Sequence, residues 1–126
     1  MTFLKSMLIA GAGGFFGTCC RFAINKLFGT LAVLPFPLAT FIANVAGCLL
    51  FGLFTGLLSR ANMLSSGQAL LLITGFCGGL TTFSTFSGEI VNIGSKGDMA
   101  SAALYLCASV VTGLFAVWLG RMIGES

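Results

Sequence analysis

Apolar residues fill four long stretches of the chain, and short polar breaks separate them. The stretches run over residues 4–28, 37–60, 68–93 and 99–123. Each exceeds the roughly 20 residues that a helix needs to cross the hydrocarbon core of a bilayer. The pattern therefore predicts an all-α membrane protein, with one domain of four transmembrane helices over residues 1–126. We interpret the first stretch as a membrane helix and not as a signal peptide.

Glycines and hydroxyl residues interrupt the third stretch near its midpoint. Gly75, Gly78 and Gly79 come first, and Thr81 and Thr82 follow. A continuous membrane helix satisfies its own backbone, so this composition favours a helix that is broken near its middle, with the unwound turn at the glycines. Carbonyl oxygens freed by such a turn can bind a cation. The alternative is a kink whose free groups bond to nearby hydroxyls or to other helices.

Two features predict a polar path beside this break. Asn44 lies inside the second stretch, where an amide needs a partner, and structural bonding between helices and contact with a ligand are both open. Phe83 and Phe86 share a face if the helix resumes after the break. Because the edge of a phenyl ring is positive, such rings together with hydroxyls suit a small anion. The alternative is that both rings meet lipid or core.

The fourth stretch carries a polar stripe at a helical spacing of four, four and three, formed by Ser101, Tyr105, Ser109 and Thr112. It indicates either the wall of a permeation path or bonds between helices, and we favour the wall. Asp98, directly before this stretch, is expected to cap its helix.

Two further charged side chains and two glycine pairs are expected to have simpler roles. Arg21 could draw anions into a vestibule or extend to the lipid headgroups, and we favour the headgroups. Glu89 could tune anion access or be a solvated charge at the membrane interface, and we favour the solvated charge. The small-xxx-small pairs, formed by Gly13 with Gly17 and by Gly52 with Gly56, predict close helix packing without naming the partner.

Composition restricts the classes of function. The chain is 57% hydrophobic and 7% charged, far outside the range of soluble domains. It has no histidine, and its acidic residues are Glu89, Asp98 and Glu125. The chain lacks the residues that paired-carboxylate catalysis, metal-dependent hydrolysis and histidine-activated nucleophiles require, so we expect no enzyme activity. The five cysteines have neither disulfide nor zinc spacing, and we interpret them as packing residues.

Cations are balanced between the two sides that four spans define. Lys5, Arg60 and Arg121 lie on one side, and Arg21, Lys26 and Lys96 on the other. An excess of Lys and Arg normally fixes orientation, and here there is none. The balance favours insertion in both orientations and an antiparallel homodimer. The alternatives are a chance balance in a chain with few charges, or an Arg21 that lies within its span and does not count.

Over essentially its whole length, the chain resembles the Fluc (CrcB-type) fluoride channels of microorganisms. The resemblance rests on Gly75-Phe76-Cys77-Gly78-Gly79-Leu80-Thr81-Thr82-Phe83-Ser84-Thr85-Phe86-Ser87, on Asn44-Val45-Ala46-Gly47, and on Gly13-Gly14-Phe15-Phe16-Gly17 followed by Arg21. It implies a multi-pass protein of the inner (plasma) membrane that passes fluoride passively, rejects chloride and protects the cell by efflux. It also implies an antiparallel dual-topology dimer with two pores.

The resemblance assigns roles to individual residues. The implied pore and fluoride-binding residues are Asn44, Phe83, Phe86, Ser84, Thr85, Tyr105 and Ser109. Arg21 is the implied vestibule residue. A structural sodium ion at the dimer interface would be held by the backbone carbonyls of Gly78 and Thr81 from both subunits. The implied partners are a second copy, fluoride and lipid, with no nucleic acid.

Two other functions fit four small spans. A small multidrug exporter needs a membrane carboxylate, typically in its first helix, and no acid precedes Glu89. An assembly subunit without transport activity would use the glycine pairs and the polar stripe only for packing, and it predicts no ion flux.

Overall fold

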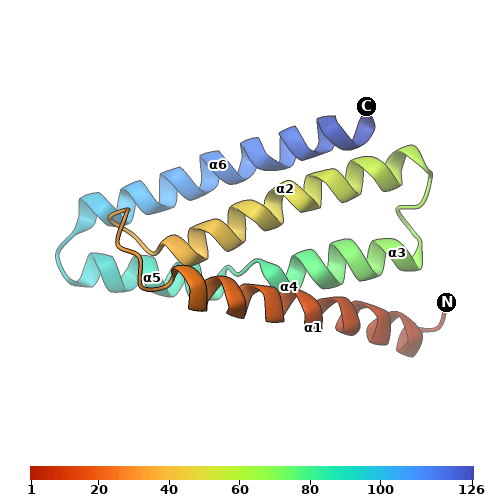
Figure 1. The fold of residues 1–126 in the computed structure, drawn as a ribbon, viewed down its shortest axis with the longest axis horizontal. Coiled ribbons are helices and arrows are strands. Elements are labelled where there is room, and N and C mark those ends of the chain that lie inside the picture. The colour runs from red at the N-terminus through yellow and green to blue at the C-terminus, as the bar shows by residue number, and fades with distance from the viewer.

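The computed structural model describes residues 1–126 as helices joined by short loops (Figure 1). The helices are α1 (Phe3–Phe28), α2 (Leu38–Arg60), α3 (Gly67–Ala69), η1 (Leu70–Cys77), α4 (Gly78–Leu80), α5 (Ser84–Ser95) and α6 (Met99–Glu125). The segments α3, η1, α4 and α5 together form the third span, Gly67–Ser95. All four spans are long and apolar enough to cross a membrane, which confirms the predicted architecture, and their ends lie within two residues of the predicted limits.

The spans form two pairs. The first span, α1, packs along η1 and α4, and α2 packs along α6. Consecutive spans run in opposite directions, so α1 and the third span are parallel and begin at the same end of the bundle (Figure 1). Many large apolar side chains remain exposed, among them Phe15 and Leu114, as expected for surfaces that face lipid.

Glycines at both helix pairs allow backbones to approach closely, as predicted, and the structure identifies the partners. A Cβ atom on Gly17 would overlap the carbonyl oxygen of Phe76 in the third span. A Cβ atom on Gly52 would overlap the carbonyl oxygen of Val117 in α6. The first glycine pair therefore packs against the third span, and the second packs against α6.

The third helix is interrupted near its middle, but not at the glycines. Gly78 is helical, with φ −63° and ψ −36°, and helix continues to Leu80. Thr81 is extended, with φ −87° and ψ 158°, and helix resumes at Ser84. The prediction that the glycines unwind was wrong. Gly75 and Gly79 instead lie directly against the backbone of α1, and this packing uses their small size and not their conformational freedom.

Asp98 caps α6 as predicted. Its Oδ1 accepts a hydrogen bond of 3.1 Å from the backbone N–H of Ser101. The carboxylate satisfies one of the free donors at this helix start.

Candidate functional site

Asn44 fixes the backbone at the break. Its Nδ2 donates to the carbonyl oxygen of Thr82 at 3.1 Å, and its Oδ1 accepts from the N–H of Thr82 at 2.8 Å. Thr82 therefore bonds across to α2 and not along its own helix. Its hydroxyl accepts from the N–H of Thr85 at 3.3 Å, so Thr82 also helps to start α5. Of the two roles left open for Asn44, the structure shows bonding between helices, with one amide hydrogen still free.

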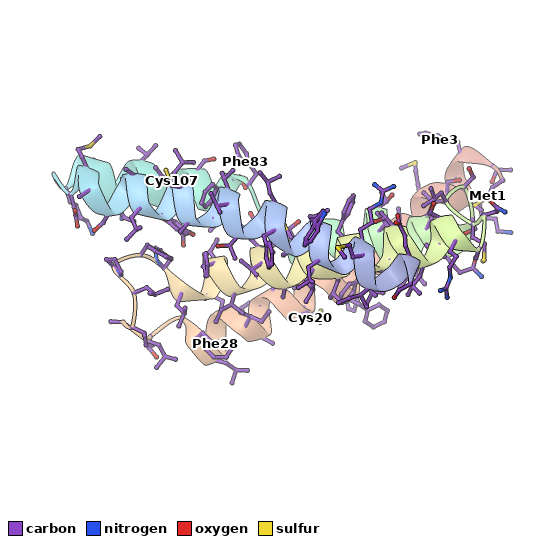
Figure 2. All side chains as sticks on the ribbon, turned by 90° about the horizontal axis from the view of Figure 1, so that it is seen from above. Met1, Phe3, Cys20, Phe28, Phe83 and Cys107 are labelled. Atoms are coloured by element: carbon purple, nitrogen blue, oxygen red, sulfur yellow. The ribbon has the colours of Figure 1, made fainter.

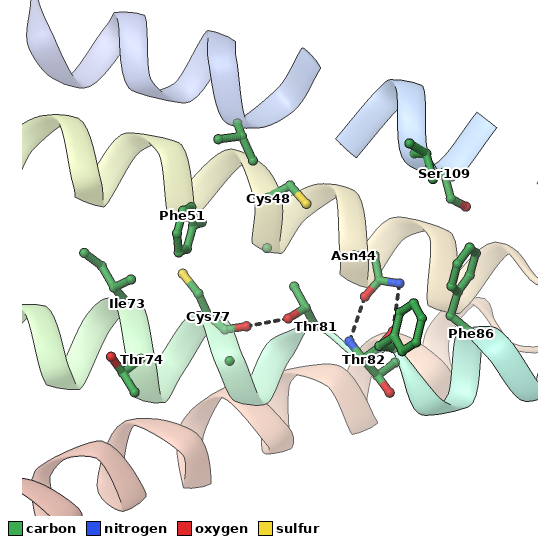
Figure 3. Close-up of a pocket in the computed structure, with 15 residues that line it drawn as sticks. Asn44, Cys48, Phe51, Ile73, Thr74, Cys77, Thr81, Thr82, Phe86 and Ser109 are labelled. Atoms are coloured by element: carbon green, nitrogen blue, oxygen red, sulfur yellow. Dashed lines mark hydrogen bonds between the residues drawn. The ribbon is translucent and has the colours of Figure 1, made fainter. Parts of the chain in front are cut away.

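A cavity of about 600 Å³ lies beside the break, between α2, α6 and the third span (Figure 3). No charged residue lines it. Its wall consists of Asn44, Gly47, Cys48, Phe51, Ile73, Thr74, Cys77, Gly78, Thr81, Thr82, Phe83, Phe86, Ser109, Val110 and Val117. The Ser109 hydroxyl is buried and has no hydrogen-bond partner. A buried hydroxyl without a partner in the chain is uncommon, and a water molecule or a ligand in the cavity would satisfy it.

Phe83 and Phe86 line the same cavity but differ in burial. Their ring centroids are 6.3 Å apart and the rings are tilted by 52°. Phe86 is only 6% exposed, whereas Phe83 is 80% exposed and lies at the outer edge of the bundle (Figure 2). The expected shared face is therefore present at the cavity, but in a single chain only Phe86 is covered.

Phe86 belongs to an aromatic cluster with Tyr105 and Phe36. Its ring meets Tyr105 edge to face at 4.9 Å, and Tyr105 stacks on Phe36 at 4.7 Å. Tyr105 is fully buried, and its hydroxyl donates to Oε1 of Glu89 at 2.8 Å. The hydroxyl of Thr40 donates to Oε2 of the same carboxylate at 3.0 Å. Glu89 is partly exposed, as a charge near the membrane interface would be, but two hydroxyls from neighbouring helices bond to its two oxygens.

Arg21 does not extend to the headgroups as expected. Its Nε donates to the carbonyl oxygen of Gly79 at 3.0 Å, just before the break. This carbonyl belongs to the last turn before the interruption, where acceptors are available. The guanidinium then lines a second cavity of about 320 Å³, together with Thr18, Phe22, Asn25, Ala39, Thr40, Thr82, Thr85 and Glu89. Thr82 lines both cavities, so both of them reach this residue of the break.

The carbonyls around the break divide into bonded and free ones. Those of Gly79 and Thr82 accept from Arg21 and Asn44, as described. The carbonyl oxygens of Gly78 and Thr81 accept no hydrogen bond within the chain, because the N–H groups that would reach them in a continuous helix bond to side chains. Both residues line the uncharged cavity, and free carbonyls there are hard oxygen ligands that suit a cation such as sodium.

The structure gathers most predicted site residues but not all of them. Asn44, Phe83, Phe86 and Ser109 line one cavity, and Thr85 and Arg21 line the other. Ser84 is exposed and lines neither of these two cavities, and Tyr105 lies behind Phe86.

Sequence reasoning missed the roles of Thr40 and Phe36 at Glu89 and Tyr105. The only signal was Thr40 one turn before Asn44. Nothing in the spacing connects Thr40 with Glu89, which is 49 residues further along the chain.

Comparison with known proteins places the chain in a family. Residues 8–121 match the family described as CrcB-like protein, Camphor Resistance (CrcB). A protein of Flavobacterium psychrophilum named fluoride-specific ion channel FluC is 39% identical over 97% of this chain and 98% of its own length. A protein of Prosthecochloris aestuarii with the same name is 42% identical over 96% of this chain and 94% of its own length. A protein of Bacillus cereus named fluoride-specific ion channel FluC 2 is 40% identical over 96% of this chain and 98% of its own length. The chain belongs to the CrcB-like family.

Proposed function

We propose that the protein is a passive, selective fluoride channel of the plasma membrane that carries fluoride out of the cell. The observation that carries this proposal is the buried, unpartnered Ser109 hydroxyl, which lies in an uncharged cavity with the free Asn44 amide hydrogen and two phenyl rings. The names of the relatives from three bacteria, all fluoride-specific channels, agree with it.

The chemistry of the cavity suits fluoride. Fluoride is small and holds its water tightly, so a selective path must replace that water with donors at close range while letting the ion leave again. Hydroxyl, amide and ring-edge hydrogens carry partial positive charge, and none of them forms an ion pair that would trap the anion. Arg21, in the second cavity, is the one cation near the break, and its guanidinium would attract an anion toward it.

A second copy is expected to complete the cavity. In one chain the cavity is open at the surface, and Phe83 is exposed beside Thr81 and Asn44. Polar groups at this depth do not face hydrocarbon in a stable membrane protein, which supports a covering partner. We propose an antiparallel homodimer with one pathway along each copy, in which a sodium ion binds to the Gly78 and Thr81 carbonyls of both copies.

The charge balance supports copies in both orientations. Because Arg21 bonds to Gly79, it lies within its span and is left out of the count. One side of the membrane then carries three cations, Lys5, Arg60 and Arg121, and the other side carries two, Lys26 and Lys96. A difference of one leaves little bias in orientation.

Anion efflux from proteoliposomes tests the proposed function. The intact protein should release fluoride rapidly and chloride slowly, as measured with ion-selective electrodes. Phe86→Ile and Phe83→Ile should abolish fluoride release because they remove the ring edges. Phe115→Ile is the matched control, since Phe115 is 57% exposed on α6 and lines neither cavity. Equal fluoride and chloride rates, or no flux from folded protein, would refute the proposal.

Labelling of a loop cysteine in cells tests the dimer. Ser65 is exposed in the loop between α2 and α3, and Ser65→Cys provides a thiol for a membrane-impermeant reagent. With dual insertion, roughly half of the copies should react from outside the cell. Labelling of all copies or of none would exclude an antiparallel dimer. A separate measurement tests the proposed sodium ion. The protein is assembled in sodium-free medium, and its size shows whether the dimer forms.

A further inference from the structure

A separate groove lies between the first turns of α1 and of the third span. These two helices begin side by side at one end of the bundle (Figure 1), the end where Figure 2 labels Met1 and Phe3. The groove has a volume of about 490 Å³ and shares no residue with the two cavities at the break. It is lined by Lys5, Leu8, Ile9, Ala12, Gly67, Gln68 and Leu71.

The lining is polar at one end and apolar along the rest. Lys5 and Gln68 lie in the first turns of their spans, at the border of the membrane. Leu8, Ile9 and Ala12 follow Lys5 on the same face of α1, because they are three, four and seven residues further on. At 1.5 Å per residue, Ala12 lies about 10 Å deeper than Lys5. The groove therefore places a cation at the level of the lipid headgroups and an apolar wall at the level of the acyl chains, which complements an anionic phospholipid.

Lys5 has no counter-ion in the protein. The only ion pair in the chain joins Arg121 and Glu125, and the other two acids are Glu89 and Asp98. All three acids are already engaged, Glu89 with two hydroxyls, Asp98 with the start of α6, and Glu125 with Arg121. No carboxylate within the chain pairs with Lys5, so an anion of the surrounding membrane can do so.

We propose that the groove binds one anionic phospholipid per chain. The lipid phosphate pairs with the Lys5 ammonium and accepts a hydrogen bond from the Gln68 amide. One acyl chain lies along Leu8, Ile9 and Ala12. Gly67 adds no side chain to the wall of the groove, and a Cβ atom there would make ordinary van der Waals contact with Met1 and Ile9.

Native mass spectrometry of the full-length protein tests this site. The probes are phosphatidylglycerol and phosphatidylcholine with identical acyl chains, added to detergent-purified protein. The intact protein should retain phosphatidylglycerol preferentially. Because a cation at the membrane surface contributes about 1 kcal/mol to binding an anionic lipid, Lys5→Gln should weaken this binding about fivefold. Ala12→Trp should lower retention of both lipids by filling the groove.

The matched control is Lys26→Gln. Lys26 lies at the opposite border of α1, over the Phe22 ring, and outside the groove. It should leave the lipid preference unchanged. The proposal is overturned if Lys5→Gln and Lys26→Gln have equal effects, or if Ala12→Trp leaves the retention of both lipids unchanged. Lys5 and Ala12 are both exposed, so their substitution leaves the helix packing intact.

Discussion

Replacing Asn44 by leucine should destabilise the break in the third span. The substitution keeps a similar volume but removes both hydrogen bonds to the Thr82 backbone, of 3.1 and 2.8 Å. If the unfolded chain in the membrane finds other partners, two bonds at about 0.6 kcal/mol each give a loss of about 1 kcal/mol. If the Thr82 N–H and carbonyl stay buried without partners, at up to about 2 kcal/mol each, the loss reaches about 4 kcal/mol.

Unfolding in mixed micelles, followed by helical circular dichroism, measures this loss. Thr55→Val is the control, because the Thr55 hydroxyl bonds only to Phe51 and Gly52 of its own helix. Its free energy of unfolding should change by less than about 0.5 kcal/mol. If Asn44→Leu is as stable as Thr55→Val, the Asn44 amide does not hold the break in the third span.

Three further outcomes are expected. Tyr105→Phe removes the hydroxyl that donates to the Glu89 carboxylate, so the free energy of unfolding should fall by about 1.5–3 kcal/mol. A loss below the measurement error would show that this bond is not formed. Gly17→Ala places a methyl group in contact with the backbone of the third span and should cost about 1–3 kcal/mol, whereas Gly88→Ala enters open space and should be neutral or stabilising in the same assay. Hydrogen bonds from Ser101, from its side chain first, lower the pKa of Asp98. Because this pKa is lower in the folded state, the stabilisation is present above the unfolded pKa of about 4 and is lost as pH falls through the folded pKa. Asp98→Asn should remove this part of the acid dependence of the unfolding midpoint, and an unchanged profile would contradict the capping role.

The candidate site was predictable where one residue carries its own signal. Asn44 in an apolar span, two phenylalanines beside hydroxyls, and a polar residue on each turn of the fourth span all indicated a polar path. The sequence did not indicate which groups pair. Thr40 with Glu89, and Arg21 with Gly79, are contacts between residues 49 and 58 positions apart, and no local spacing encodes them.

The position of the break was likewise only partly predictable from the sequence. Glycine content marked the correct part of the third span, but the interruption falls at residues 81–83, where the Asn44 amide replaces helical bonding. The glycines remain helical because α1 packs against them. Glycine can serve backbone flexibility or close helix packing, and both roles need a residue without a side chain. The local sequence could therefore not show which role applies.

By itself, the sequence determined four membrane spans, because their apolar length and lack of charge fix how each segment partitions into lipid. It also determined the exclusion of catalysis that needs histidine or paired carboxylates. Only the tertiary structure decided which carbonyls stay free, which hydroxyls hold Glu89, and that Ser109 has no partner. These properties depend on which helix faces which, and hydrogen-bond partners are set by distances across the bundle that no single span encodes.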